Sequence, residues 1–145
     1  MKTFIGIIGA ISLAIFVAWL NARNNRKNRL VNAAEKFRNI IHKSLKGIYP
    51  STESYLTTEE KDRITQSSIN QINSAGSEFS HYLGFISKYR FRKALKKYCE
   101  TTRKINWDED MARKRFPNTK FKNNCITGKQ FRKSVSHLLT FANEK

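Results

Sequence analysis

The run of residues from Phe4 to Leu20 carries no charge, and it limits most strongly what this chain can fold into. As a helix rising about 1.5 Å per residue it is roughly 25 Å long, slightly short of the ~30 Å hydrocarbon core of a bilayer. Extension to Ala22, with Trp19 at the boundary, brings the run into the usual length range of a spanning helix. We therefore expect a transmembrane anchor over residues 1–22.

The charges that flank the run distinguish an anchor from a cleaved secretion signal. A signal carries its charge before the apolar run and small residues at a cleavage site after it, whereas only Lys2 precedes this run and no Ala-x-Ala pattern follows. Four basic residues come directly after it: Arg23, Arg26, Lys27 and Arg29. Because positive charge beside a span stays in the cytoplasm, we expect a single-pass protein of the cell inner membrane, with its N-terminus outside and a cytoplasmic domain over 23–145. A cleaved signal and a buried core helix are the alternatives.

Small residues recur at every fourth position inside the run: Gly6, Ala10, Ala14, Ala18 and Ala22. In lipid, where no hydrophobic effect drives helices together, small side chains let two helix backbones approach closely. This face predicts a homodimer, or docking to another membrane helix. The alternative is that the pattern reflects only the general abundance of Ala and Gly in membrane spans.

The rest of the chain is strongly basic and leaves room for one small domain. The 145 residues include 28 Lys and Arg against 11 Asp and Glu, which gives a formal charge of +17. Hydrophobic residues make up 39% of the chain, and because the anchor uses many of them, the core of the domain must be small. A charge excess of this size bears on partners rather than on fold, and it favours anionic lipid headgroups or nucleic acid.

Apolar residues recur at threes and fours over 29–48, 58–74 and 77–104, the period of helices with one buried face. We expect the first of these helices to continue from the anchor without a break. Gly47 and Pro50 should then stop it, because glycine and proline commonly mark a helix C-terminus.

Local signals give the expected ends of the other helices. Thr57 and the glutamate three residues later make a capping box, the Ser-Ala-Gly at 74–76 indicates a break, and the long third helix bends near Gly84. The segment 105–126 shows no clean period and predicts a loop, after which Thr127 caps a last helix. The predicted fold class is all-α: a single N-terminal transmembrane helix followed by a small bundle of about four amphipathic helices.

The third predicted helix carries the strongest candidate for a binding site. Its basic residues gather on two neighbouring faces, with Arg90, Lys93 and Lys97 on one and Arg92 and Lys96 on the other. Such a surface neutralises the phosphates of lipid or nucleic acid; the alternative is a solvated face that keeps a small protein soluble. Tyr89 and Phe91 interleave with these charges, as in base-stacking platforms, although Phe91 also fits a core position.

One dense acidic cluster, Asp108 to Asp110, stands beside the basic residues 113–115. Paired carboxylates serve magnesium-dependent phosphoryl chemistry, so Asp108 and Asp110 suggest a metal-dependent hydrolase as a weak alternative. Three adjacent acids point in different directions, however, and salt bridges to Arg113, Lys114 and Arg115 are the plainer expectation.

Metal ligation and nucleophilic chemistry find little support in the remaining residues. His42, His81 and His137 fall on three different predicted helices without the spacing of a zinc site. Cys99 and Cys125 fit an exported disulfide and a reducing compartment equally well. We expect no metal, no cofactor and no catalytic residues.

Four stretches form a distinctive combination: the N-terminal span, AAEKFRNIIHKSLKGIYP, EFSHYLGFISKYRFRKALKKYC and the terminal LLTFAN. This combination resembles a family of small bacterial membrane-anchored helical proteins with no assigned activity. The matching residues are Phe37, Arg38, Pro50, Glu78, Phe79, Leu83, Phe91, Ala94, Tyr98, Leu138, Leu139, Phe141 and Ala142. The family's usual Trp in the central motif is Leu95 here, and FPNTKFKNNC replaces an acidic-aromatic segment before the last helix. The resemblance implies the anchored helical fold and supplies no function.

Together these features predict a single-pass membrane protein that acts by binding rather than catalysis and presents a basic helical domain at the cytoplasmic membrane surface. The expected partners are anionic lipid headgroups, a second copy of the chain or another membrane helix. The first alternative is a membrane-tethered nucleic-acid-binding protein, and the second is the hydrolase using Asp108 and Asp110.

Overall fold

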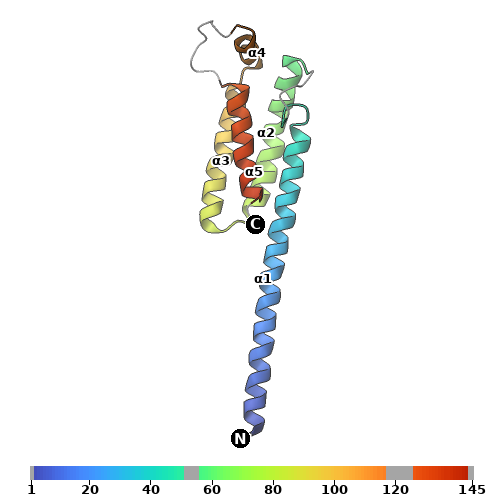
Figure 1. Ribbon diagram of the computed structural model, residues 1–145, viewed down its shortest axis with the longest axis vertical. Coiled ribbons are helices and arrows are strands. Elements are labelled where there is room, and N and C mark those ends of the chain that lie inside the picture. The colour runs from blue at the N-terminus through green and yellow to red at the C-terminus, as the bar shows by residue number, and fades with distance from the viewer. Residues whose placement is uncertain (1, 51–55, 117–125, 144–145) are drawn as a thin grey trace.

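Figure 1 shows a computed structural model of the protein, in which a helical bundle lies at one end of a single long helix. The structure describes residues 2–50, 56–116 and 126–143, with side chains from Leu13 onward. Within these residues the chain forms five helices and no strand: α1 (Lys2–Ser44), α2 (Thr58–Ser80), α3 (Phe85–Lys104), α4 (Trp107–Arg115) and α5 (Gly128–Asn143). The all-α prediction is confirmed.

Four of these helices form the bundle. The second half of α1, then α2, α3 and α5 run alternately in opposite directions, the up-down-up-down arrangement (Figure 1). Both α1 and α3 contact α2 and α5, so α1 and α3 occupy diagonal corners. The short helix α4 lies at the far end of the bundle from the first half of α1 and contacts α2.

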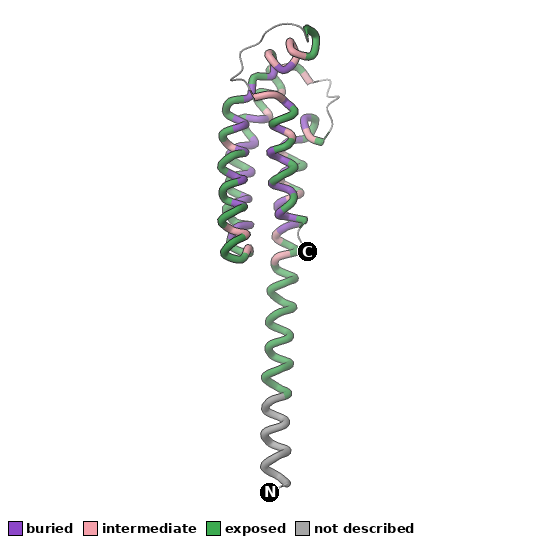
Figure 2. The backbone as a smooth tube through the Cα atoms, turned by 60° about the vertical axis from the view of Figure 1, so that its left-hand side comes forward, coloured by how far each residue is buried: buried purple, intermediate pink, exposed green. Residues whose placement is uncertain are grey.

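The helix α1 continues without a break from the apolar run into the bundle, as predicted. No glycine or proline occurs between residues 10 and 46 to interrupt it. Every residue from 13 to 29 is exposed, and Leu30 is the first that is partly buried (Figure 2). The bundle therefore begins near Leu30, and the described part of α1 before it is a single unaccompanied helix.

The predicted transmembrane anchor over residues 1–22 is not supported by the described residues. Over that part of the chain, no helix combines the length and the apolar character needed to cross a bilayer. Side chains are described for only residues 13–22 of the predicted anchor, and the side chains of 1–12 lie outside the described part.

A tight turn at Gly47 ends α1. Gly47 has a φ of +88°, which a residue without a Cβ adopts at no steric cost, and a Cβ there would lie 2.8 Å from Leu56 Cδ1. The N–H of Ile48 donates to the carbonyl of Leu45 (3.0 Å) within this turn. Pro50 follows shortly after and has no N–H with which to continue a helix. The predicted stop at these two residues is confirmed.

The helix α2 begins with the predicted capping box and ends later than predicted. Thr57 Oγ1 accepts the N–H of Glu60 (3.2 Å), and the Glu60 carboxylate accepts the N–H of Thr57 (2.8 Å). The expected break at 74–76 is wrong, because α2 runs on to Ser80. Gly76 is buried against α3, and a Cβ there would lie 2.9 Å from a Leu95 methyl carbon. This glycine allows close approach of two helices and does not interrupt either.

The single bent helix predicted over 77–104 is instead two antiparallel helices. α2 ends at Ser80, and α3 begins after Gly84, whose backbone is extended (φ −63°, ψ 161°). Along one continuous helix Phe79 and Phe91 would lie about 18 Å apart, whereas their ring centroids are 5.2 Å apart. The chain reverses because both side chains belong to one core.

Four phenylalanines, one from each helix of the bundle, meet at the centre of that core: Phe37, Phe79, Phe91 and Phe141. Phe37 stacks on Phe79, with ring centroids 5.2 Å apart. Phe91 meets Phe79 and Phe141 edge to face, at 5.2 Å and 5.6 Å. Aromatic pairs of this geometry contribute about 0.5–1.5 kcal/mol each beyond the burial of their area.

The predicted loop over 105–126 contains the short helix α4, so that prediction is wrong for its first half. Asn106 Oδ1 accepts the N–H of Glu109 (3.1 Å) and caps the helix, a local signal that the weak periodicity concealed. Ile105 and Ile126 form an isolated parallel bridge that closes the segment. Residues 117–125 lie outside the described part of the chain.

The last helix, α5, starts with a second capping box, as predicted for Thr127. Thr127 Oγ1 accepts the N–H of Gln130 (3.3 Å), and Gln130 Oε1 accepts the N–H of Thr127 (2.9 Å). Every apolar residue on the inner face of α5 is buried: Phe131, Val135, Leu138, Leu139, Phe141 and Ala142.

A buried hydrogen bond also joins α2 to α3. The Tyr98 hydroxyl lies 2.8 Å from Ser68 Oγ, and both residues are fully buried. Because Ser68 Oγ donates to the carbonyl of Thr65 (2.7 Å), Tyr98 is the donor to Ser68. Burial raises the pKa of Tyr98.

Replacing Tyr98 with Phe should lower the free energy of unfolding by about 1 kcal/mol at neutral pH, because Ser68 loses a buried partner. The raised pKa adds a dependence on pH. An unfolded tyrosine ionises at about pH 10, before the folded one, so the contribution of Tyr98 is complete below that pH and is lost as pH rises through the folded pKa.

Urea unfolding at neutral pH and above pH 10 measures both effects, with Trp107 fluorescence as the signal in a Trp19→Phe background and a non-ionic detergent. The loss of stability on going to alkaline pH should be smaller in Tyr98→Phe than in the parent protein. Equal losses in the two proteins would contradict the assignment.

Candidate functional site

The five predicted basic residues form one exposed surface along α3, here called the α3 basic face: Arg90, Arg92, Lys93, Lys96 and Lys97. The residues between them on the opposite side of α3 are buried: Phe91, Ala94, Leu95 and Tyr98. This alternation follows the helical period, because side chains three and four residues apart share a face. The core therefore holds α3 in the orientation that presents the basic face outward.

No acidic side chain neutralises the α3 basic face among the described residues. The salt bridges among the described residues lie elsewhere: Lys36–Glu78 (2.8 Å), Arg113–Glu109 (2.7 Å) and Lys114–Asp110 (3.1 Å). From Phe79 to Cys99 the sequence contains no Asp or Glu at all. Glu100 is the first acid after this range, and it lies on α3 at the end of the face. Five cations against this one carboxylate leave the face with a net positive potential that suits an external anion.

A hollow of about 480 Å³ between α3 and α5 extends this basic surface. Lys97 of the α3 basic face borders it, together with Lys133 and His137 of α5. The hydroxyl of Thr101 and the amide of Gln130 also line it, and none of the described residues contributes a carboxylate. Such a lining suits an anionic group such as a phosphate.

The α5 contribution to this hollow was missed in the sequence. Lys133 and His137 lie four residues apart on one face of α5, which is a weak signal on its own. They join Lys97 only because α3 and α5 lie side by side, and nothing in the local sequence specifies that pairing.

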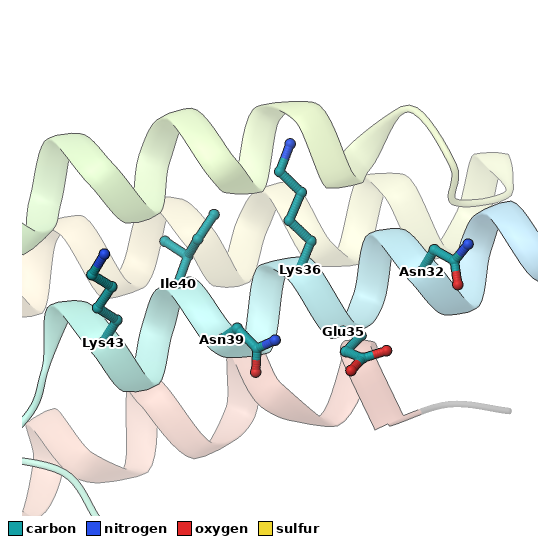
Figure 3. Close-up of a pocket in the computed structure, with 6 residues that line it drawn as sticks. All are labelled: Asn32, Glu35, Lys36, Asn39, Ile40 and Lys43. Carbon is teal, nitrogen blue, oxygen red and sulfur yellow. The ribbon is translucent and has the colours of Figure 1, made fainter.

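A second hollow, of about 450 Å³, runs along the outer surface of α1 (Figure 3). All the residues that line it come from α1: Asn32, Glu35, Lys36, Asn39, Ile40 and Lys43. Lys36 points toward α2, where its amine donates to the Glu78 carboxylate (2.8 Å). This contact and the neighbouring Glu78 carboxylate raise the pKa of Lys36. One helix alone supplies the lining, so no set of reactive groups converges in it.

The two aromatic residues of the basic segment differ in accessibility. Phe91 is fully buried in the core, which confirms its core placement and excludes it as a platform for a nucleic-acid base. Tyr89 is 70% exposed and remains available for an external contact.

The acidic cluster is divided among different structural contacts. Asp110 is buried, and its Oδ1 accepts the N–H of Gly128 (2.8 Å) at the start of α5. Glu109 pairs with Arg113, and Lys114 pairs with Asp110, so two of the expected salt bridges are confirmed. Asp108 is exposed.

The carboxyl group of Asp62 on α2 lies near enough to Asp108 to respond to its charge. Partial burial of Asp62, and secondarily the charge of Asp108, raise the pKa of Asp62. Even so, no three His, Cys, Asp or Glu side chains of the described residues come close enough together to hold a metal ion.

The histidines and cysteines do not add a site. His42 is on α1, His81 follows α2 and His137 is on α5, so the three lie on separate elements. Cys99 is half-buried, and burial raises the pKa of its thiol, which makes the thiol less reactive. Cys125 lies outside the described residues.

Comparisons of the chain with protein-family models, with curated proteins and with solved structures give no match.

Replacing Asp110 with Ala should lower the free energy of unfolding by about 1–2 kcal/mol, because the first turn of α5 loses the acceptor of a buried N–H. Asp108→Ala removes an equal charge from an exposed neighbour and should change stability by less than about 0.5 kcal/mol. Urea unfolding followed by Trp107 fluorescence, again in the Trp19→Phe background, compares the two variants. Equal effects would contradict the capping role of Asp110.

Proposed function

We propose that this protein is a non-enzymatic binding protein, held in the inner membrane by the first half of α1 with its basic bundle at the cytoplasmic surface. The observation that carries the proposal is the exposed apolar helix that extends beyond the bundle. Its large side chains are 37% to 65% exposed: Leu13, Ile15, Phe16, Val17, Trp19 and Leu20.

These apolar side chains surround the helix. Residues 13, 16, 17 and 20 share one face, and Ile15 and Trp19 lie on another. A helix that is apolar on all sides is stable where a protein core or lipid covers it, and removal of each such side chain from water contributes about 1.5–3 kcal/mol. No described part of the bundle covers this segment, and lipid supplies that cover along the whole run from Phe4 to Leu20.

The flanking charges support the proposed orientation. Arg23, Arg26, Lys27 and Arg29 are all exposed directly after the apolar segment. The Arg23 guanidinium lies 5.6 Å from the centroid of the Trp19 ring, an aromatic and cationic pair suited to the headgroup level. Retention of these four charges on the cytoplasmic side places the bundle there.

Self-association belongs to the same proposal. Ala14 and Ala18 are exposed on α1, and they continue the small-residue face of Gly6 and Ala10, whose side chains lie outside the described part. A homodimer, or docking to another membrane helix, would use this face, because small side chains permit close backbone contact in lipid.

The proposed membership of the family of small bacterial membrane-anchored proteins rests on core residues. Phe37, Phe79, Phe91 and Phe141 are among the matching residues, and they form the centre of the bundle. The resemblance supports a shared helical fold and adds no activity to the proposal.

Fusion of reporters after Lys145 tests the proposed topology, with one reporter active only in the cytoplasm and one only outside it. We expect cytoplasmic activity and retention of the chain in membranes washed with alkaline carbonate. Replacing Arg23, Arg26, Lys27 and Arg29 with Gln should increase the fraction in the opposite orientation. Replacing Lys43, Lys46, Arg63 and Lys104 with Gln removes the same charge from the bundle and should not. Release of the chain by carbonate would refute the anchor.

The hollow between α3 and α5 favours one second candidate, a membrane-tethered nucleic-acid binder. Lys97, Lys133 and His137 border this space, and no described carboxylate lines it; Lys and Arg side chains of this kind neutralise phosphates. A gel shift with the full chain in neutral-lipid nanodiscs tests this alternative across a range of salt. A tight complex at physiological salt that is lost when the α3 basic face is changed to Gln would favour nucleic acid. No complex is expected if lipid or protein is the partner.

A further inference from the structure

We propose that the turn between α2 and α3 is a second membrane contact, which enters the headgroup layer of the cytoplasmic leaflet. This inference rests on the proposed function and identifies the part of the bundle that meets the lipid. The segment concerned, residues 81–89, is called here the α2–α3 tip.

The α2–α3 tip exposes large apolar side chains that the fold does not use. Phe85 is 90% exposed, Tyr89 70%, Ile86 69% and Tyr82 44%. Beyond the apolar part of α1, the only other large hydrophobic side chains exposed among the described residues are Val31 and Phe116. A cluster of such residues on a small protein marks a surface that is covered by something else.

The α2–α3 tip lies at the end of the bundle from which α1 emerges (Figure 1). The exposed apolar part of α1 extends from the same end, whereas α4 lies at the opposite end. If α1 crosses the membrane, the α2–α3 tip is the part of α2 and α3 that faces the leaflet. The apolar part of α1 and the α2–α3 tip therefore lie at the same end of the bundle.

The charges around the α2–α3 tip complement an anionic surface. Lys88, Arg90 and Arg92 accompany the apolar residues, and no acid occurs between Phe79 and Cys99. Aromatic and aliphatic residues beside Lys and Arg are typical of segments that lie in the membrane interface, with the rings at the acyl boundary and the cations at the phosphates. The tip of a second copy is disfavoured as the occupant, because the Lys and Arg side chains of the two tips would repel each other.

The geometry of α1 requires a tilt for this contact. From Leu20 to Leu30 the helix rises about 15 Å, and the headgroup layer covers only about 5–7 Å of that height. Diagonal helices of a bundle with neighbours 8–10 Å apart are separated by about 13 Å. A tilt of about 30° is within the usual range for spanning helices. It moves the α2–α3 tip roughly 6 Å closer to the bilayer, and the side chains of Phe85 and Ile86 reach across the remaining distance to the headgroups.

Lipid quenching of a fluorophore tests this contact in the full chain reconstituted into vesicles of phosphatidylcholine and phosphatidylglycerol. In a background with Cys99→Ser and Cys125→Ser, an environment-sensitive dye is attached through Ile86→Cys, and separate chains carry it through Leu20→Cys or Lys104→Cys. Lys104 is exposed at the other end of the same helix. We expect lipids with headgroup nitroxides to quench the dye at position 86 severalfold more strongly than the dye at position 104.

A matched pair of variants relates the quenching to the apolar side chains. Phe85→Ser with Tyr89→Ser should reduce quenching at position 86 to the level at position 104. Phe116→Ser removes an exposed ring from the far end of the bundle and should leave it unchanged. The fluorescence of buried Trp107, with Trp19→Phe added to the background, verifies that each variant is folded.

The three dye positions separate failure of this inference from failure of the proposed function. Strong quenching at position 20 with weak quenching at position 86 would overturn the membrane contact and leave the anchor intact. A blue-shifted but unquenched dye at position 86 would overturn it in favour of a protein partner. Absence of quenching at position 20 would refute the anchor, and the contact at the α2–α3 tip with it.

Discussion

The contact of four phenylalanine rings, one from each long helix, is the interaction on which the rest of this molecule depends. Phe37 sets the rotation of α1, Phe79 and Phe91 bring α2 and α3 together, and Phe141 closes the bundle with α5. Each helix places one ring at a common centre, which fixes the rotation of that helix. The helical period then determines which of its other residues face the core and which face outward. The rows of cations on α3 point outward for the same reason that Phe91 points inward.

The bundle combines a small apolar core with an unbalanced charge. Few acids are available to offset the 28 basic residues. Each salt bridge described for the bundle has at least one exposed or partly exposed side chain, and exposed pairs contribute about 0–1 kcal/mol. A strongly positive compact domain works against its own stability through self-repulsion. Binding to an anionic surface would relieve that repulsion, so partner binding and domain stability are linked.

Much of the fold was predictable because its signals are local. The capping boxes at Thr57 and Thr127 and the stop at Gly47 each depend on a few neighbouring residues. Gly76 and Gly84 show where local signals fail: the first lies inside a helix and the second begins one. Only the contact of Gly76 with Leu95 across the bundle distinguishes them. The five cations of the candidate site were predictable from period, whereas Lys133 and His137 join them through helix pairing.

Because α1 is one continuous helix, it connects the apolar segment rigidly to the bundle. A helix turns by about 100° and rises about 1.5 Å with each residue, so the number of residues between Trp19 and Phe37 determines the azimuth and height of every bundle surface relative to the apolar segment. A rotation of that segment, for instance on association with another helix, would turn the whole bundle through the same angle. The stretch of α1 that carries Arg23, Arg26, Lys27 and Arg29 therefore transmits rotation from the apolar segment to the bundle, in addition to carrying positive charge.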